Sequence, residues 1–116
     1  MATNVLGGPL GDCNHDPVSG YYRDGCCQTG PDDAGSHTVC ATVTREFLGH
    51  QKALGNDLTQ PAPSFRGLAP GDRWCVCVTR WKQAYDDGVA PPVHLAASHS
   101  KALVVVTLEQ LQAHAA

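Results

Sequence analysis

Two segments of this chain repeat the same order of residue types, and this echo constrains the fold more than any other feature. Residues 39–45 align with residues 74–80, with cysteine, valine, threonine and arginine at matching positions. Each segment is rich in strand-forming residues and is followed by a helix-type run that ends at a glycine, Gly55 or Gly88. The echo therefore predicts two strand-to-helix units.

The apolar pattern sets the bounds of these units. Alternating residues predict strands over 37–43 and 73–78. Helices are expected from the N-cap Thr44 to residue 54, and over 80–87 with Thr79 as the cap. We therefore expect each strand to turn directly into its helix.

The last quarter of the chain continues the mixture of strands and helices. Short strands are predicted over 93–97 and 104–106, and Thr107 with Gln110 has the spacing of a capping box at the start of a final helix. Intermixed elements predict an α+β fold with a small mixed or antiparallel sheet. A length of 116 residues suits a single domain, 1–116, with one modest core.

Glycine and proline are frequent in residues 1–36 and in the connection formed by residues 56–72. Such density prevents regular helices and strands. Because apolar residues recur in the first segment, we expect it to be irregular yet packed on the body, 37–116, through Leu6, Tyr21 and Tyr22.

Charge and hydropathy exclude several classes of partner. The net charge is −3 and no run of lysine or arginine occurs, so we expect no nucleic-acid binding. No apolar run approaches the ~20 residues that span a bilayer, and the N-terminus lacks the features of a secretory signal. The sequence therefore predicts a cytoplasmic protein without a membrane partner, and leaves a small-molecule or protein partner open.

The chain has six cysteines, which a reducing cytosol would keep as thiols, so we expect no disulfide. Zinc is the first function that these thiols suggest, in a ligand- or metal-binding module. The spacing of Cys75 and Cys77 does not favour binding of one zinc ion by both residues. On a strand, residues i and i+2 lie ~6.6 Å apart along the backbone, whereas two sulfurs on one zinc lie roughly 3.8 Å apart. The candidate metal ligands are Cys26, Cys27, His37, Cys40, Cys75 and Cys77.

A small thiol-dependent enzyme is the alternative. Its nucleophile would be Cys26, Cys27 or Cys77, activated by nearby positive charge and by a base such as His37 or His94. A third possibility is an interaction module whose cysteines only pack, because free cysteine is among the most buried residue types. We expect any site where the Cys26–Cys27 loop meets His37 and the second strand.

Charged residues near the thiols are candidates for binding a ligand. Arginine presents a planar fork that matches a carboxylate or phosphate, although pairing with a neighbouring aspartate would serve structure alone. The candidate ligand-binding residues are Arg23, Asp24, Arg73 and Arg80. The two tryptophans, Trp74 and Trp81, are predicted to lie in the core.

Five motifs together carry a resemblance to a known family. They are Asn4-Val5-Leu6-Gly7-Gly8-Pro9-Leu10, Tyr22-Arg23-Asp24-Gly25-Cys26-Cys27, His37-Thr38-Val39-Cys40-Ala41, Gly55-Asn56-Asp57-Leu58 and Pro70-Gly71-Asp72-Arg73-Trp74-Cys75-Val76-Cys77. In this combination the chain resembles a bacterial family known as domain of unknown function 2237. The resemblance covers nearly the whole chain and implies a stand-alone domain in which the thiol segments and His37 belong to the family pattern. It implies no activity.

Overall fold

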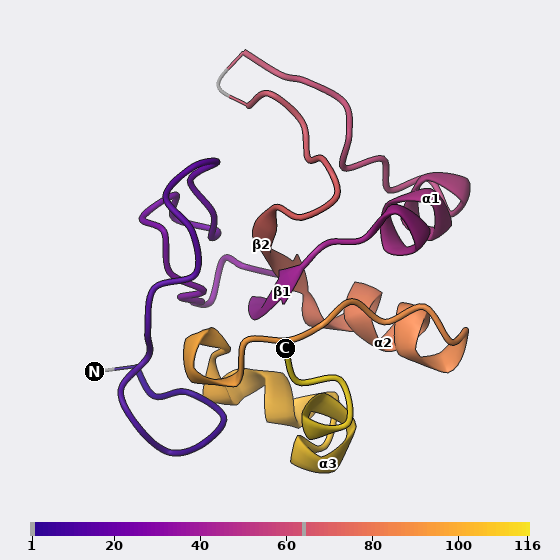
Figure 1. The fold of residues 1–116 in the computed structure, drawn as a ribbon. Coiled ribbons are helices and arrows are strands. Elements are labelled where there is room, and N and C mark those ends of the chain that lie inside the picture. The colour runs from indigo at the N-terminus through magenta and orange to yellow at the C-terminus, as the bar shows by residue number, and fades with distance from the viewer. Residues whose placement is uncertain (1, 64) are drawn as a thin grey trace.

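The two echoing segments form the centre of the fold. The computed structural model describes residues 2–63 and 65–116. Strand β1 (His37–Thr42) leads to helix α1 (Arg45–Ala53), and strand β2 (Arg73–Cys77) leads to helix α2 (Val78–Asp86). The strands pair antiparallel in a two-stranded sheet (Figure 1). This confirms the predicted small α+β domain and both strand-to-helix units.

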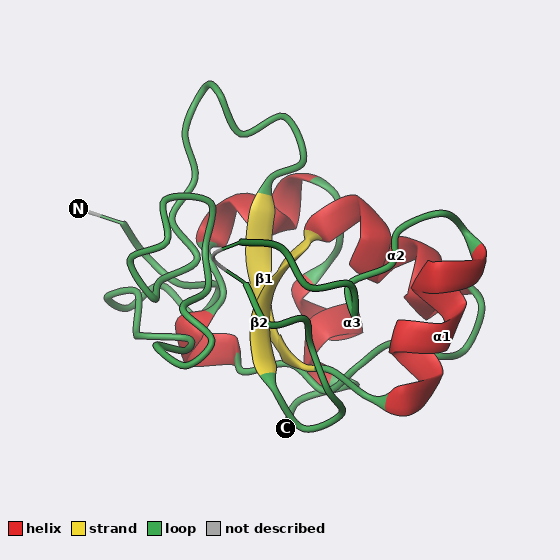
Figure 2. Cartoon of the chain, turned by 90° about the horizontal axis from the view of Figure 1, so that it is seen from above, coloured by secondary structure: helices red, strands yellow, loops and turns green. Residues whose placement is uncertain are grey.

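The sheet separates two kinds of structure. The N-terminal loops lie on one side of the strands, and α1 and α2 lie on the other (Figures 1 and 2). Helix α3 (Leu108–Gln112) lies beside α2, while the connection between α1 and β2 forms a long loop above the sheet. The N-terminal loops therefore gather on one side of the sheet, where they reach one face of both strands (Figure 1).

The helix starts differ between the two units. The hydroxyl of Thr44 accepts a hydrogen bond from the N–H of Phe47 at 3.1 Å, which confirms it as the N-cap of α1. Helix α2 starts earlier than predicted, with Cys77 as its N-cap instead of Thr79. The N–H of Val78 donates to the carbonyl of Ser36, so a backbone group from another segment satisfies one N–H of the first turn, and the Cys77 side chain caps none of the others.

The strands predicted over 93–97 and 104–106 are wrong. In the first region, Val93 makes only isolated bridges and the 3₁₀-helix η1 (Leu95–Ala97) follows. The second region begins at the last residue of the 3₁₀-helix η2 (Ser100–Val104) and continues as a turn. Val104 is 84% exposed and no strand among the described residues pairs with it, so local i to i−3 hydrogen bonds satisfy the backbone instead. The capping box of Thr107 and Gln110 is confirmed at the start of α3.

Both faces of the sheet are buried. One face belongs to the main core, which includes both predicted tryptophans, and the other belongs to a small cluster of cysteines and Ala97. The cross-strand pairs alternate accordingly: Val39 faces Val76, and Cys40 faces Cys75. The main core is formed by Val5, Val39, Ala41, Val43, Phe47, Leu48, Leu68, Trp74, Val76, Val78, Trp81, Ala84, Val93, Ala102, Val106 and Leu111.

The N-terminal segment is held by other residues than those predicted. Leu6, Tyr21 and Tyr22 are 54%, 39% and 53% exposed, so they are not its anchors. Val5 enters the main core, and the buried amide of Asn4 donates to two backbone carbonyls, those of Pro9 and Ala96. Polar anchors of this kind carry no hydrophobic signal in the sequence.

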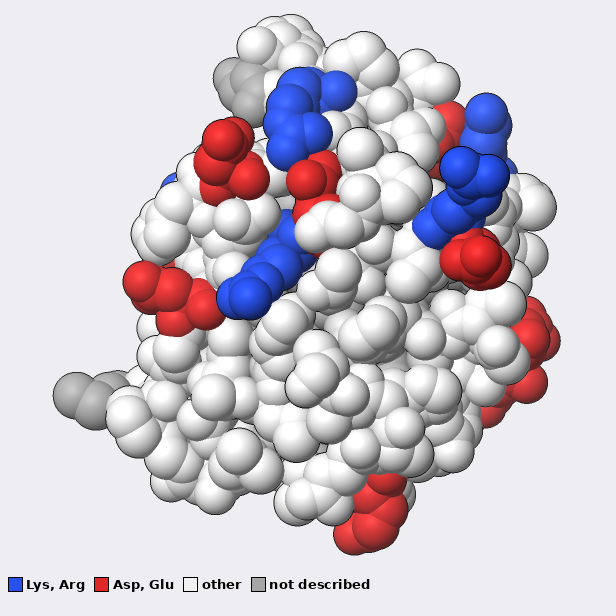
Figure 3. Space-filling model, in the orientation of Figure 1, with Lys and Arg blue, Asp and Glu red and all other residues white. Residues whose placement is uncertain are grey.

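The surface shows no single dominant charge on the face in Figure 3. Lysine and arginine side chains lie beside aspartate and glutamate there, and much of the face is uncharged. Among the described residues, no helix has the length and apolar character that crossing a membrane requires.

Replacing the N-cap of α1 tests the first strand-to-helix unit. We expect Thr44→Ala to lower the free energy of unfolding by about 1 kcal/mol, because the N–H of Phe47 loses its acceptor. Thr44→Ser keeps the hydroxyl and should restore most of that stability. Urea denaturation measures both; equal losses in the two variants would show that the hydroxyl does not cap the helix.

Candidate functional site

Four of the six cysteines form two disulfides, which corrects the expectation of six free thiols. Cys13 is bonded to Cys40, and Cys27 to Cys75, with S–S distances of 2.07 and 2.05 Å. The reason is topological: the N-terminal loops cover the cysteine face of the sheet, so each strand cysteine meets a loop cysteine. This pairing removes Cys27 from the candidate nucleophiles and engages three of the candidate metal ligands, Cys27, Cys40 and Cys75.

The disulfide sulfurs nevertheless form one compact group. Those of Cys13, Cys27 and Cys75 lie within 4.8 Å of one another, a spacing at which three thiolates could hold a metal ion. All of these residues are buried. The group differs from the predicted metal set, because it includes Cys13 and leaves out Cys26, His37, Cys40 and Cys77.

Cys26 is one of the two free cysteines and is poorly suited to be a nucleophile. Its thiol donates to the carboxylate of Asp12 at 3.0 Å. Burial, this hydrogen bond, and the negative charges of Asp12 and Asp24 raise the pKa of Cys26 to about 11. The thiol is therefore almost entirely protonated at neutral pH.

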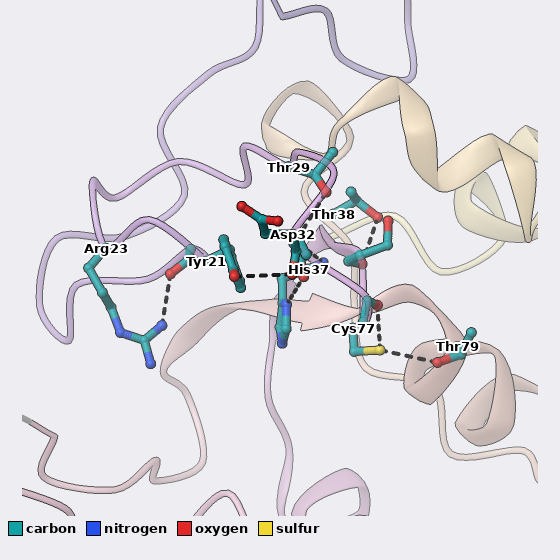
Figure 4. A network of polar contacts seen from close by, with 12 residues as sticks. Tyr21, Arg23, Thr29, Asp32, His37, Thr38, Cys77 and Thr79 are labelled. Atoms are coloured by element: carbon teal, nitrogen blue, oxygen red, sulfur yellow. Dashed lines mark hydrogen bonds and ion pairs between the residues drawn. The ribbon is translucent and has the colours of Figure 1, made fainter.

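Cys77 is the other free cysteine and lies where β2 becomes α2. Its thiol donates to the carbonyl of Gly35 at 2.6 Å, and its Sγ lies 3.1 Å from the hydroxyl of Thr79 (Figure 4). The Cys77 side chain makes no capping hydrogen bond to α2. The N–H groups of the helix's first turn point out of this end and favour negative charge there.

An irregularity in the sheet places His37 opposite Cys77. The pairing is regular from Val39 to Thr42. If it continued, Thr38 would pair with Cys77, but a register shift between residues 37 and 39 pairs His37 with Cys77 instead. Just before it, Ser36 has a φ of 50°, which is strained for a residue with a side chain. Bulges and strained residues are frequent beside functional sites, where they redirect a side chain.

His37 is held by a buried carboxylate. Its Nδ1 lies 2.7 Å from Oδ1 of Asp33, while the other carboxylate oxygen accepts from the backbone N–H of His37 and from the hydroxyl of Thr29. Burial alone would raise the pKa of Asp33, but these hydrogen bonds and the attraction of His37 outweigh it and leave the pKa lowered. The carboxylate therefore fixes the ring and directs Nε2 away from itself.

The imidazole and the thiol share a narrow space beside Gly35. A Cβ atom added to Gly35 would lie 3.1 Å from Cε1 of His37 and 3.3 Å from Sγ of Cys77. The imidazole ring and the sulfur therefore both border the same small space beside Gly35. The ring of Tyr21 stacks on His37 with centroids 6.1 Å apart. Figure 4 shows these side chains together at the end of the sheet.

A cavity of about 300 Å³ opens onto this pair. Its wall is partly apolar, from Leu58, Trp74 and Val76, and partly polar, from Asn56 and Arg80. Arg80 follows Cys77 by one helical turn and is half-buried. The cavity could therefore hold a small molecule with both an apolar and a polar or anionic part.

The other predicted ligand-binding residues lie elsewhere. The guanidinium of Arg23 donates to the carbonyl of Gly20 and lies 5.0 Å from the ring centre of Trp74. Asp24 accepts from the N–H of Cys26. Arg73 lines a second cavity of about 360 Å³ with Asp12 and His94, where burial and Arg73 lower the pKa of His94.

Of the predicted site residues, the structure brings together His37, Cys77 and Arg80. Cys27 does lie against Cys75, as expected, but as its disulfide partner. The sequence reasoning missed Cys13 and Asp33. Asp33 lies four residues before His37, a spacing that could have drawn attention to it, whereas Cys13 stands alone in a loop and gives no signal of its partner.

The model of a family described as an uncharacterized protein conserved in bacteria, DUF2237, matches residues 3–115. No curated protein matches the chain.

The carboxylate beside His37 should make stability depend on pH. Because the pKa of Asp33 is lowered in the folded protein, its ionised form contributes stability that is complete above about pH 4 and is lost as the pH falls further. Asp33→Asn should cost about 1–3 kcal/mol at neutral pH and progressively less in acid. Asp32→Asn, at an exposed neighbour, is the control; a cost for Asp33→Asn that stays constant down to acid pH would contradict the assignment.

The reactivity of Cys26 should follow from its raised pKa. We expect slow alkylation by iodoacetamide at neutral pH and a steep rise as the pH approaches about 11. Asp12→Asn should accelerate the reaction at neutral pH, because it removes the negative charge that favours the protonated thiol. Asp16→Asn, which changes an exposed carboxylate in the same loop, should leave the rate unchanged in peptide-level mass spectrometry.

Proposed function

Because the chain belongs to DUF2237, an uncharacterized family, we propose its function from the geometry alone: a thiol-dependent enzyme that transfers or hydrolyses an acyl group on a small molecule. Cys77 is the nucleophile, His37 the general base and Asp33 the residue that orients His37. The observation that carries the proposal is that this thiol and imidazole line one cavity, while the buried carboxylate holds the imidazole.

The arrangement has the order that nucleophilic catalysis requires. A base lies next to the nucleophile, and a third group holds the base in one orientation and tautomer. With Nδ1 of His37 directed to Asp33, Nε2 is the nitrogen left to exchange a proton with Cys77. Asp33 stays ionised at neutral pH and stabilises the imidazolium that forms.

The reaction would proceed in two steps. His37 takes the thiol proton as Sγ of Cys77 attacks the carbonyl carbon, and the tetrahedral intermediate expels its leaving group with a proton from His37. The product is a thioester on Cys77. Water, or an acceptor deprotonated by His37, then attacks this carbonyl, and the carbon–sulfur bond breaks to return the thiol.

Two features support the negative charge that develops on the carbonyl oxygen. The first turn of α2 presents N–H groups at Cys77, and the guanidinium of Arg80 lines the same cavity. Arg80 donates only to the amide oxygen of Gln83 within the described chain, so its other N–H groups are available.

The thiol must rotate before it reacts. It donates to the carbonyl of Gly35, and rotation about its Cα–Cβ bond turns Sγ toward His37. The two residues are cross-strand partners, whose Cβ atoms lie about 4.5–5.5 Å apart in antiparallel sheets, so this movement needs no change in the backbone.

The other predicted functions have less support. The expected Cys/His metal set is divided among the disulfides, the Asp12 contact and the cavity. An interaction module would leave the link between Asp33 and His37 without a purpose. The cytoplasmic location stays a prediction, and two disulfides favour an oxidising compartment.

Acylation by p-nitrophenyl acetate tests the proposal. We expect a burst of nitrophenol and a single acetyl group on the peptide that carries Cys77, found by mass spectrometry. His37→Gln should slow the acylation by about 10²–10⁴-fold, and Asp33→Asn should also slow it. Cys26→Ser is the matched control, because it removes the other free thiol and leaves the cavity intact.

Two results would overturn the assignment. Acetylation that occurs at Cys26 as fast as at Cys77 would show that the site confers no special reactivity. An unchanged rate at Cys77 in both His37→Gln and Asp33→Asn, each verified as folded by circular dichroism, would show that the histidine is not its base.

A further inference from the structure

The sulfur cluster behind the sheet, formed by Cys13, Cys27, Cys40 and Cys75, plays no part in the proposed acyl chemistry. We propose that it has a second state: after reduction, its four thiolates bind one Zn²⁺ and hold the same segments together. This site is separate from the cavity of His37 and Cys77, and the inference does not depend on the proposed function.

Three of the ligands are already close enough. The sulfurs of Cys13, Cys27 and Cys75 lie within 4.8 Å of one another. Sulfurs on a tetrahedral zinc lie roughly 3.8 Å apart. After reduction, the sulfurs of Cys27 and Cys75, which are 2.05 Å apart in their disulfide, must separate to about that distance, while the sulfur of Cys13 needs to approach them by about 1 Å or less. Small rotations of the cysteine side chains provide such a movement without a change in the backbone.

Cys40 supplies the fourth ligand. It lies directly opposite Cys75 in the sheet, where facing Cβ atoms are about 4.5–5.5 Å apart, and its sulfur is bonded to that of Cys13. Once that bond is reduced, rotation about the Cα–Cβ bond of Cys40 turns the sulfur toward the other three. Four protein ligands leave no open position, which is the arrangement of a structural zinc site.

A buried hydrogen-bond donor lies next to the sulfurs and could stabilise the negative charge of the zinc site. Four thiolates around Zn²⁺ carry a net charge of −2, which burial penalises unless donors are present. The hydroxyl of Ser19 is fully buried, lies 3.5 Å from Sγ of Cys75 and donates at present to the carbonyl of Asn14. Rotation of this hydroxyl would direct its proton to the thiolate.

A dithiol can supply the electrons and protons that reduction of the two disulfides requires. Each disulfide takes two electrons and two protons from one dithiol, which becomes a disulfide, and the protein gains four thiols. Zinc then binds the four thiolates and displaces their four protons. The zinc form replaces two covalent links with four metal–sulfur bonds between the same loop and strand segments.

The test uses a Cys26→Ser, Cys77→Ser double variant, which retains only the four cysteines of the cluster. The protein is reduced with dithiothreitol, desalted without oxygen and titrated with Co²⁺ as a spectroscopic substitute for zinc. We expect one Co²⁺ per chain, with the intense visible bands and sulfur charge-transfer absorption of a tetrahedral tetrathiolate. One equivalent of Zn²⁺ should abolish them, and the zinc-bound form should melt at a higher temperature than the reduced, metal-free form.

Two further samples decide the ligand set. The oxidised double variant should bind no Co²⁺, and Cys13→Ser in the reduced double variant should lose the tetrathiolate spectrum. Weak, six-coordinate Co²⁺ bands, a stoichiometry well below one, a spectrum unchanged by Cys13→Ser, or a reduced chain that zinc neither binds nor stabilises would each overturn the proposal.

Discussion

The pairing of β1 with β2 is the interaction on which the rest of this structure depends. It is the only sheet within residues 2–63 and 65–116, and it organises three different environments. One face carries the valines and Trp74 into the main core, while the other carries Cys40 and Cys75 into the sulfur cluster. At the end of the β1–β2 pairing, a single shift in register places His37 opposite Cys77.

The sequence was informative where local chemistry decides structure. Thr44 and Thr107 mark helix starts because a hydroxyl satisfies nearby N–H groups, and the alternation around Val39 and Val76 marks strands with a buried face. It failed where distant segments decide. The valines near residue 105 suit a strand, yet no strand in the described part of the chain pairs with them. The start of α2 depends on the carbonyl of Ser36, which is far away in the sequence.

The candidate site divides in the same way. His37, Cys77 and Arg80 stood out by residue type, and the repeat already placed Cys77 beside a helix start. Nothing in the pattern showed that the bulge would bring His37 across from Cys77, or that Asp33 would be buried behind it. The disulfides were hidden for a similar reason, because the position of Cys13 against β1 is a product of how an irregular loop folds.

The two disulfides also give the irregular loop an unusual connectivity. Cys13 and Cys27 are attached to neighbouring strands, so the chain between them closes a covalent ring through Cys40, Cys75 and the backbone that joins them. A protease that cut within residues 14–26 would open this ring without releasing a fragment. Both new ends would stay tethered to the sheet, each by its own cystine, and the nick would become visible only after reduction.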